Sequence, residues 1–411
     1  MSAAYRQAVE QRFEAWLGTL WDQAQARGVS RATFDKALKV NRLDWSLPDL
    51  DLPDLGPGAP QAPPEARREK QQPQAEFSIP ANYFPESSLN AYVSMGRTLK
   101  TQWADTLAAV ERTYGVDADV VLAVWARETG YGRARLPHNA MRVLATQAFM
   151  GRRQERFKEE LLLALQIVEA DHIGVEEMAS SWAGAMGHTQ FMPSDFMNYA
   201  VDFDGDGRRD VWRSVPDSLA STANSLKTNG WETGKTWAYE VRLSAGFDCT
   251  LQGPDKARPI AEWVRLGVTR THGRAFPPER LSDGGFLVLP AGMKGPAFLA
   301  LKNFLVLKAY NFADLYAIYV GHLADRIGNN RGFETPWGEV GRFRRDEVLR
   351  LQHAMAAQGI EVGKLDGLIG AKVRASVGEY QRKLGMPVDC YPSRDLLARA
   401  NRLPWASERR P

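Results

Sequence analysis

Glu128 has the surroundings expected of an acid–base catalyst. A helix is predicted over residues 117–130, and its most apolar stripe carries Val121, Val124 and Trp125. Glu128 falls on the same stripe, at the end where glycines break the helical pattern. An apolar setting disfavours the charged form of a carboxyl group and raises its pKa, so Glu128 is a candidate general acid near neutral pH. The alternative is a structural glutamate paired with a nearby arginine.

Residues 181–196 have the composition of a sugar-binding segment. Small residues alternate with large ones, which permits close approach of the backbone to a ligand. Ser181 and Gln190 offer neutral hydrogen-bonding groups, while Trp182 and Phe191 offer flat apolar surfaces. A sugar uses both, because its hydroxyls bond to polar groups and its C–H faces pack on aromatic rings. The alternative is a tightly packed, glycine-rich junction between helices.

An acidic loop follows directly. Asp202, Asp204 and Asp206 stand at positions 1, 3 and 5, with glycine at position 6, as in the opening of an EF-hand calcium loop. Position 12 is Arg213 instead of the expected glutamate, but Asp217 could close a longer loop. Neighbouring carboxylates repel one another unless a cation lies between them, which favours a structural calcium site. A solvated acidic turn is the alternative.

Composition excludes several functional classes. The 411 residues carry a net charge of +3, too little for a dedicated nucleic-acid binder. The two cysteines, Cys249 and Cys390, have no metal-binding or redox spacing, and we expect free thiols more than a cross-link. No apolar run approaches the length of a membrane span. The first residues also lack a secretory-signal pattern, which leaves a cytosolic protein or one with its signal removed.

The predicted elements place these motifs in a mainly α (α+β) protein. Seven prolines in residues 48–73 predict an extended linker or a wrapping arm. Short β-rich runs over 238–243 and 286–290 predict a small sheet packed on the helical body. Helices are predicted over 3–27, 31–38, 98–114, 118–128, 140–149, 152–170, 216–228, 312–327, 345–358, 371–384 and 393–401.

Taken together, these segments resemble the membrane-bound lytic transglycosylase B family of peptidoglycan-cleaving enzymes. The resemblance covers about residues 5–328 and is carried by residues 125–132, 181–194, 199–207 and 303–317. It implies a lysozyme-like fold that cleaves the β-1,4 bond between N-acetylmuramic acid and N-acetylglucosamine. The muramoyl C6 hydroxyl attacks its own C1, which leaves a 1,6-anhydro end. Glu128 matches the single catalytic acid/base.

The same resemblance assigns further residues. It implies sugar-binding groups at Ser181, Gln190 and Phe191, cleft tyrosines at Tyr310 and Tyr316, a basic pair for the stem peptide at Arg152 and Arg153, and a looser match at Tyr83. The metal loop would use Asp202, Asp204, Asp206, the Arg208 carbonyl and Asp217. Ser225 stands where the family often has a cleft tyrosine, so that subsite is expected to be more open.

Residues 351–389 resemble a three-helix peptidoglycan-binding domain, although Cys390 stands where glycine is usual. We therefore expect N-terminal helices over 1–47, a linker over 48–74, a lysozyme-like catalytic domain with a β-rich insertion over 75–330, and the three-helix domain over 343–402.

The expected partners are peptidoglycan glycan strands and other cell-envelope proteins, with no nucleic acid and no transmembrane segment. No cofactor is expected for catalysis. The substrate implies the periplasm. The alternatives are a lysozyme-type hydrolase and a non-catalytic wall-binding protein.

Overall fold

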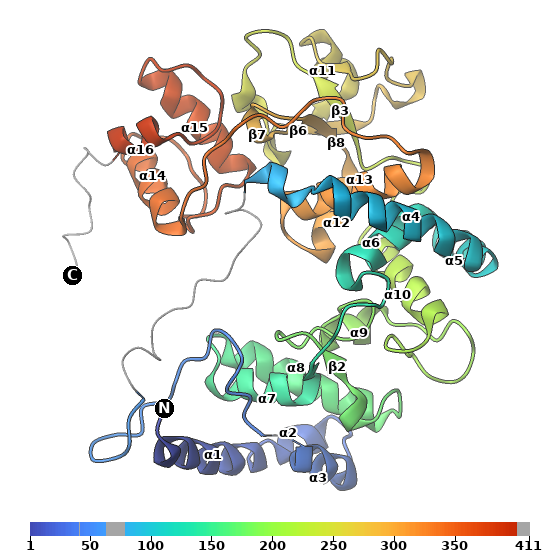
Figure 1. Cartoon of the computed structure of the whole chain (residues 1–411), viewed down its shortest axis with the longest axis vertical. Helices are drawn as coiled ribbons and strands as arrows, with labels where there is room; N and C mark the ends of the chain where they lie inside the picture. Colours follow the sequence, from blue (N-terminus) through green and yellow to red (C-terminus); the bar gives the residue numbers. More distant parts are fainter. Residues whose placement is uncertain (41, 63–78, 401–411) are drawn as a thin grey trace. The chain divides into compact units, whose positions relative to one another are not determined.

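The computed structural model describes residues 1–40, 42–62 and 79–400, which form two compact units (Figure 1). Unit 1 contains the described residues up to 62 and residues 103–228. Unit 2 contains residues 79–102 and 229–400. None of the helices in these described ranges has the length and hydropathy to cross a lipid bilayer.

Unit 1 is helical, with one two-stranded ribbon that brings distant segments together. The ribbon pairs β1 (His138–Asn139) with β2 (Ala179–Ser180) in antiparallel register. The helices are α1 (Ala3–Gly18), α2 (Trp21–Ala26), α3 (Arg31–Val40), α5 (Ala104–Tyr114), α6 (Ala118–Thr129), α7 (Ala140–Met150), α8 (Gln154–Glu169), α9 (Pro193–Tyr199) and α10 (Val215–Thr228), with a 3₁₀ turn at Val175–Glu177. Helices α7 and α8 pack along each other, and α3 contacts both (Figure 1).

The N-terminal segment packs onto the rest of unit 1. The predicted helix over 3–27 is divided in two, because the helical hydrogen bonds stop at Thr19, whose hydroxyl bonds back to the Trp16 carbonyl at 2.6 Å. Farther along, the Asp51 N–H donates to the Met150 carbonyl at 2.7 Å, and the Tyr5 hydroxyl donates to the Pro53 carbonyl at 2.8 Å. The described part of the proline-rich segment is therefore a wrapping arm. Residues 63–74 of the predicted linker lie outside the described residues.

Unit 2 is built around a five-stranded sheet of antiparallel neighbours in the order β4-β6-β8-β3-β5. Its strands are β3 (Ala238–Arg242), β4 (Arg258–Pro259), β5 (Thr269–Arg270), β6 (Gly284–Val288) and β8 (Ala297–Ala300), with β7 (Pro290–Met293) beside them. Short helical segments accompany the sheet: α11 (Ile260–Arg265) and the 3₁₀ turns Pro80–Tyr83, Cys249–Leu251, Pro254–Lys256 and Pro278–Arg280. Longer helices complete the unit: α4 (Glu86–Gln102), α12 (Lys302–Tyr310), α13 (Asp314–Asn329), α14 (Arg345–Ala357), α15 (Ala371–Lys383) and α16 (Arg394–Ala400).

The predicted mainly α (α+β) class with a small sheet and three C-terminal helices is confirmed. The single helix predicted over 98–114 is wrong, because α4 ends at Gln102 and α5 begins at Ala104. Trp103 between them has φ −108° and ψ 26°, which is not helical, so the chain bends there.

The expectation of two free thiols is also wrong. Cys249 and Cys390 form a disulfide, with Cα atoms 6.1 Å apart, although 141 positions separate them in sequence. Both residues are fully buried. Helix α15 packs against the 3₁₀ turn at Cys249–Leu251, so the fold of unit 2 brings the two sulfurs together. Sequence spacing could not reveal this, because the three-helix domain has to dock on the sheet first.

Candidate active site

Glu128 lies in the last turn of α6, where the structure provides the predicted apolar stripe. Val121 and Val124 are fully buried and Trp125 is 5% exposed. Glu128 itself is half-buried, so part of its side chain is accessible. Partial burial is compatible with the predicted general acid, which must be partly dehydrated and still reach a ligand.

A turn with three consecutive left-handed residues follows α6 directly. Gly130, Tyr131 and Gly132 all have left-handed backbones, with φ of 56°, 62° and 77°. A side chain at Gly132 would place a Cβ atom 2.7 Å from the His188 ring, so only glycine fits. The chain therefore reverses sharply directly after Glu128, and the reversal packs against the segment that carries His188.

Thr129 joins this turn to the predicted sugar-binding segment. Its hydroxyl accepts a hydrogen bond from the Gly132 N–H at 3.1 Å and donates one to the His188 carbonyl at 3.2 Å. Thr129 is only 1% exposed, so water does not compete for these bonds. The sequence did not reveal that Thr129 links the turn to the loop that carries His188. Its position directly after the candidate acid was a signal, but its partner lies 59 residues away.

Residues 181–191 form a folded loop with internal hydrogen bonds. The Gln190 amide N–H groups donate to the carbonyls of Ala185 at 3.2 Å and Gly187 at 3.0 Å. The Ser181 hydroxyl accepts a bond from the Ala185 N–H at 3.3 Å. Ser181 and Gln190 are both half-buried, so part of each polar side chain is accessible. The two predicted sugar-binding residues therefore stabilise the loop that presents them.

The loop packs closely on its neighbours. A Cβ atom at Gly187 would lie 2.3 Å from the Val211 carbonyl oxygen, which explains why this position is glycine. Phe191 is 3% exposed and therefore serves mainly as core, whereas Trp182 is 38% exposed and presents an open aromatic face. The His188 ring lies 5.7 Å from the Trp125 ring, and burial lowers the pKa of His188. Its imidazole is therefore neutral near pH 7.

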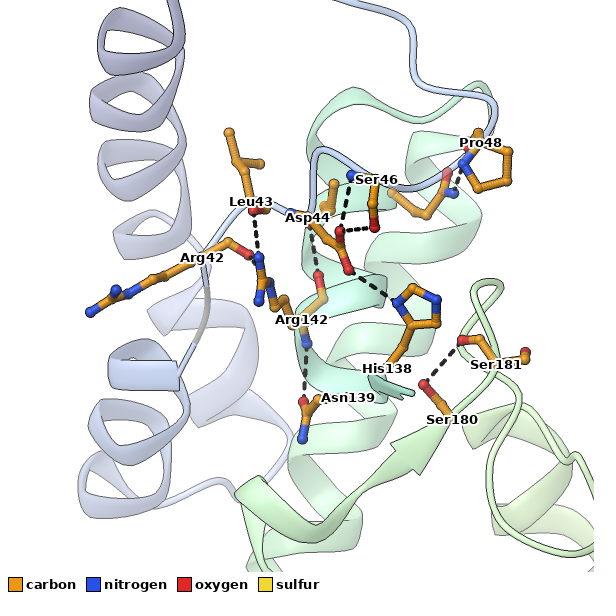
Figure 2. A network of polar contacts seen from close by, with 12 residues as sticks. Arg42, Leu43, Asp44, Ser46, Pro48, His138, Asn139, Arg142, Ser180 and Ser181 are labelled. Atoms are coloured by element: carbon orange, nitrogen blue, oxygen red, sulfur yellow. Dashed lines mark hydrogen bonds and ion pairs between the residues drawn. The ribbon is translucent and has the colours of Figure 1, made fainter. Parts of the chain in front are cut away.

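A polar network fixes the ribbon at the start of this loop (Figure 2). Asp44, from the N-terminal segment, contacts His138 of β1 at 3.1 Å, and His138 pairs across the ribbon with Ser180 of β2. Arg142 donates to the carbonyls of Arg42 and Leu43 at 3.1 and 3.0 Å (Figure 2). The N-terminal segment thereby anchors the strand that leads into Ser181. None of these contacts was visible in the sequence, because Asp44 and His138 are 94 positions apart.

The other predicted binding residues lie in different places. Arg152 and Arg153 are exposed just before α8 in unit 1. Tyr310 and Tyr316 belong to unit 2, where their rings stack at 6.4 Å with an interplanar angle of 9°. Tyr83, also in unit 2, is half-buried against Tyr319. A role for these tyrosines beside Glu128 stays a prediction. Ser225 on α10 is almost fully buried, so its small side chain adds little open space to the subsite that was expected there.

The acidic loop brings three carboxylates together. Asp202, Asp204 and Asp217 offer oxygen atoms that all lie within 4.8 Å of one another. Asp217 is fully buried and accepts backbone N–H bonds from Phe203 at 2.8 Å and Asp210 at 2.8 Å. Burial raises the pKa of Asp217, partly offset by these bonds. A raised pKa and converging oxygens fit a hard cation such as calcium, whose charge would stabilise the ionised form.

The two remaining predicted ligands lie on the same loop. The Asp206 carboxylate accepts the Arg208 N–H at 2.8 Å, and the Arg208 side chain pairs with Asp171 at 2.7 Å. Asp206 is not among the three converging carboxylates in the described chain. Its participation, and that of the Arg208 carbonyl, stay predictions.

Two sequence profiles of known domains match this chain. Residues 12–325 match the sequence profile of the transglycosylase SLT domain, and residues 344–399 match that of a peptidoglycan binding domain. Membrane-bound lytic murein transglycosylase B of Escherichia coli (strain K12) is 30% identical over 237 residues. That match covers 57% of this chain and 63% of the relative, so the chain spans less than two thirds of the relative's length.

Solved structures extend the comparison. The crystal structure of SltB3 from Pseudomonas aeruginosa in complex with NAG-anhNAM-pentapeptide has 36% sequence identity and a TM-score of 0.79, covering 95% of this chain and 99% of that one. The Escherichia coli lytic transglycosylase Slt35 in complex with calcium has 28% identity and a TM-score of 0.53, covering 62% and 78%. Since the family profile spans most of the sequence and includes the Glu128 helix, the chain belongs to the transglycosylase SLT domain family.

Proposed function

We propose that this chain is a lytic murein transglycosylase. It cleaves the β-1,4 bond between N-acetylmuramic acid and N-acetylglucosamine and leaves a 1,6-anhydromuramoyl end, with Glu128 as the only acid/base. The observation that carries the proposal is the half-buried Glu128 at the end of an apolar helix, tied through Thr129 to a loop with Ser181 and Gln190. Membership in the family and the muropeptide named in the SltB3 structure support it.

The reaction needs two proton transfers at one carboxyl group. Protonated Glu128 gives its proton to the glycosidic oxygen as the bond from that oxygen to the muramoyl C1 breaks. The resulting carboxylate then accepts the proton of the C6 hydroxyl as its oxygen bonds to C1. Glu128 ends protonated, and no water is consumed. The nucleophile belongs to the same sugar, so it acts at high effective concentration.

The absence of charged residues from the loop at 179–194 supports a mechanism with a single catalytic carboxylate. Residues 179–194, which pack against the Glu128 turn, contain no Asp, Glu, Lys or Arg. An ordinary glycosidase needs a second carboxylate as nucleophile or as base for water. This loop offers only hydroxyl, amide, imidazole and aromatic groups beside the first carboxylate, which suits a reaction with an internal nucleophile.

The test is product analysis on purified sacculi. We expect the full chain to release muropeptides with anhydro ends and Glu128→Gln to release almost none. Glu176→Gln, which changes an exposed glutamate in the same unit, is the matched control and should keep full activity. Products one water heavier, with reducing ends, would favour a lysozyme-type hydrolase. Unchanged release by Glu128→Gln would remove Glu128 from its role and favour a non-catalytic wall-binding protein.

We further propose a structural calcium ion in the acidic loop. Asp202, Asp204 and Asp217 would hold it, and Asp206 and the Arg208 carbonyl would complete the set. The ion would offset carboxylate repulsion and fix the segment between α9 and α10, with no part in the reaction itself. The calcium named in the Slt35 structure is consistent with this proposal.

Residues 343–400 are proposed to bind the wall polymer, and the periplasm is the proposed place of action. A buried disulfide is typical of an oxidising compartment, and peptidoglycan lies outside the cytoplasm. Other cell-envelope proteins remain proposed partners.

A further inference from the structure

A polar cavity of about 430 Å³ lies in unit 2, and its lining includes none of the residues assigned above. It is lined by residues of β3, β5, the loop after β5, the end of α13 and the segment that follows α13. Aromatic side chains form part of its wall: Trp237, Phe298 and Phe333. His322 stacks on Phe333 at 3.7 Å, and burial, with Arg326 nearby, lowers its pKa to about 3. This wall is therefore uncharged at neutral pH.

Arginines concentrate around the same cavity: Arg270, Arg274, Arg280 and Arg331. Arg270 lies over the Tyr239 ring at 4.5 Å and donates to the Ala275 carbonyl at 2.9 Å. Within the described chain, Arg270, Arg274 and Arg331 form no ion pair with a carboxylate. Burial, together with repulsion from Arg274 and Arg331, lowers the pKa of Arg270. Three like charges close enough to repel one another would be relieved by an anion between them.

Three residues of the lining carry carboxyl groups, and two of them accept hydrogen bonds from neutral N–H donors. The Glu240 carboxylate accepts N–H bonds from Glu334 at 2.9 Å and Thr335 at 2.8 Å, and burial raises its pKa. Asp325 accepts a bond from the Trp237 indole at 3.1 Å. Glu279, the third acidic residue of the lining, is exposed and accepts no such hydrogen bond within the described chain.

Ion pairs engage two charged groups at or near the cavity, Glu334 and Arg280. The Glu334 carboxylate is bound by Arg242 and by the backbone and ring of His272. Arg280 donates to the Gly234 carbonyl at 2.9 Å and lies 3.7 Å from Asp283. Among the arginines of the lining, Arg270, Arg274 and Arg331 therefore have guanidinium groups without an ion-pair partner in the described part of the chain, and these groups can receive the carboxylates of a ligand.

We propose that this cavity is a binding site for a short acidic peptide with several free carboxylates, the chemistry of a peptidoglycan stem. The inference rests on the proposed function for the identity of the peptide. Guanidinium groups suit it because their paired N–H donors match the two oxygens of a carboxylate. The cavity is in the size range of small-ligand sites, and its aromatic wall would pack against the aliphatic parts of the peptide.

The experiment is calorimetric titration of the full chain with L-Ala-γ-D-Glu-meso-diaminopimelate, in parallel with the same tripeptide with its carboxylates amidated. We expect the free tripeptide to bind and the amidated form not to bind. The double variant Arg274→Gln/Arg331→Gln should weaken binding by about tenfold or more. Both arginines are exposed and unpaired, so the fold should persist, which circular dichroism checks.

Two further variants locate the site. Arg112→Gln removes an exposed arginine of unit 1 and should leave binding unchanged. Arg152→Gln/Arg153→Gln removes the basic pair that the family resemblance assigns to the stem peptide, so it tests the competing site for the same tripeptide. Loss of binding in that variant, with retention in Arg274→Gln/Arg331→Gln, would overturn the proposal.

Other results would overturn it as well. These are the absence of binding by the free tripeptide, equal binding of the amidated form, and displacement by inorganic phosphate at the concentration of the tripeptide itself. Glu128→Gln separates this inference from the proposed function. If that variant loses anhydro-product release but binds the tripeptide normally, the proposed function and the cavity assignment both stand. If the native chain releases anhydro products normally but fails to bind the tripeptide, only the cavity assignment falls.

Discussion

Arg374 of α15 and Asp314 of α13 form an ion pair at 2.9 Å that fastens the C-terminal domain to the helices of unit 2. Their side chains are 4% and 13% exposed. Lys308 reaches the other oxygen of Asp314 at 2.7 Å, and the Gln252 side chain accepts a bond from Arg374 at 3.1 Å. Together with the Cys249–Cys390 disulfide, these contacts hold the C-terminal domain against the rest of unit 2, in addition to the chain connection after α13.

Removing the arginine of this pair should be costly. We expect Arg374→Gln to lower the free energy of unfolding by about 3 kcal/mol, because it leaves a buried carboxylate with only Lys308 to balance it. Arg382→Gln on the same helix breaks an exposed pair with Asp248 and should cost less than about 1 kcal/mol. Urea unfolding of the two variants measures the contrast. Equal losses would show that the buried pair is energetically no different from an exposed one.

The same pair should make stability depend on acid pH. Burial by itself would raise the pKa of Asp314, but attraction to Arg374 and Lys308 outweighs it and lowers the pKa. The stability contributed is present above the unfolded-state pKa of about 3.9 and is lost as the pH falls through the lowered folded-state pKa. The difference in unfolding free energy between the native chain and Arg374→Gln should therefore shrink below about pH 4. A difference that stays constant down to the acid limit of folding would contradict this assignment.

The disulfide should contribute strongly to thermal stability. Cys249 and Cys390 close a long loop, for which the loss of a cross-link typically costs roughly 2–5 kcal/mol. We expect Cys249→Ala/Cys390→Ala to melt at a lower temperature and to gain hydrogen-exchange signal first in residues 343–400. Reductant should lower the melting temperature of the native chain and leave the double variant unchanged. A native chain that contains titratable free thiols would show that the bond is absent.

Thr129 should act as a positioning residue for Glu128. Thr129→Val keeps the shape but leaves the Gly132 N–H and the His188 carbonyl without their partner, so the turn that carries Glu128 loosens. We expect kcat for wall cleavage to fall by about tenfold or more with little change in KM, since small displacements of a catalytic group are expensive. Thr129→Ser restores the hydroxyl and should recover most of the rate. Similar kcat values for the two variants would assign Thr129 a packing role alone.

Calcium should stabilise the chain by binding the folded state. A ligand that binds only the native protein raises its melting temperature by mass action, so added calcium should raise it and a chelator should lower it. Asp202→Asn removes one of the converging carboxylates and should abolish most of the shift, whereas Asp105→Asn, an exposed acid on α5, should retain it. A melting temperature indifferent to both calcium and chelator would favour a solvated acidic turn.

Local sequence determined the elements and the candidate acid, because periodicity and chain breakers act over a few residues. The stripe of Val121, Val124 and Trp125 placed Glu128 on the apolar face of a helix, and the structure has that helix at Ala118–Thr129. The three C-terminal helices were predictable for the same reason. Helix ends were less predictable, as at Trp103, because one residue outside the helical region is enough to end a helix.

Tertiary structure decided which distant groups meet. Cys249 meets Cys390, Asp44 meets His138, and Thr129 meets His188 only after helices and strands have packed, and no local pattern records these pairings. Tertiary packing also decided which side chains are buried. Phe191, which was expected to face a sugar, is 3% exposed and lies mostly in the core. The physical reason is that side-chain type sets what a residue can bind, whereas chain packing sets the partner, the distance and the access of water.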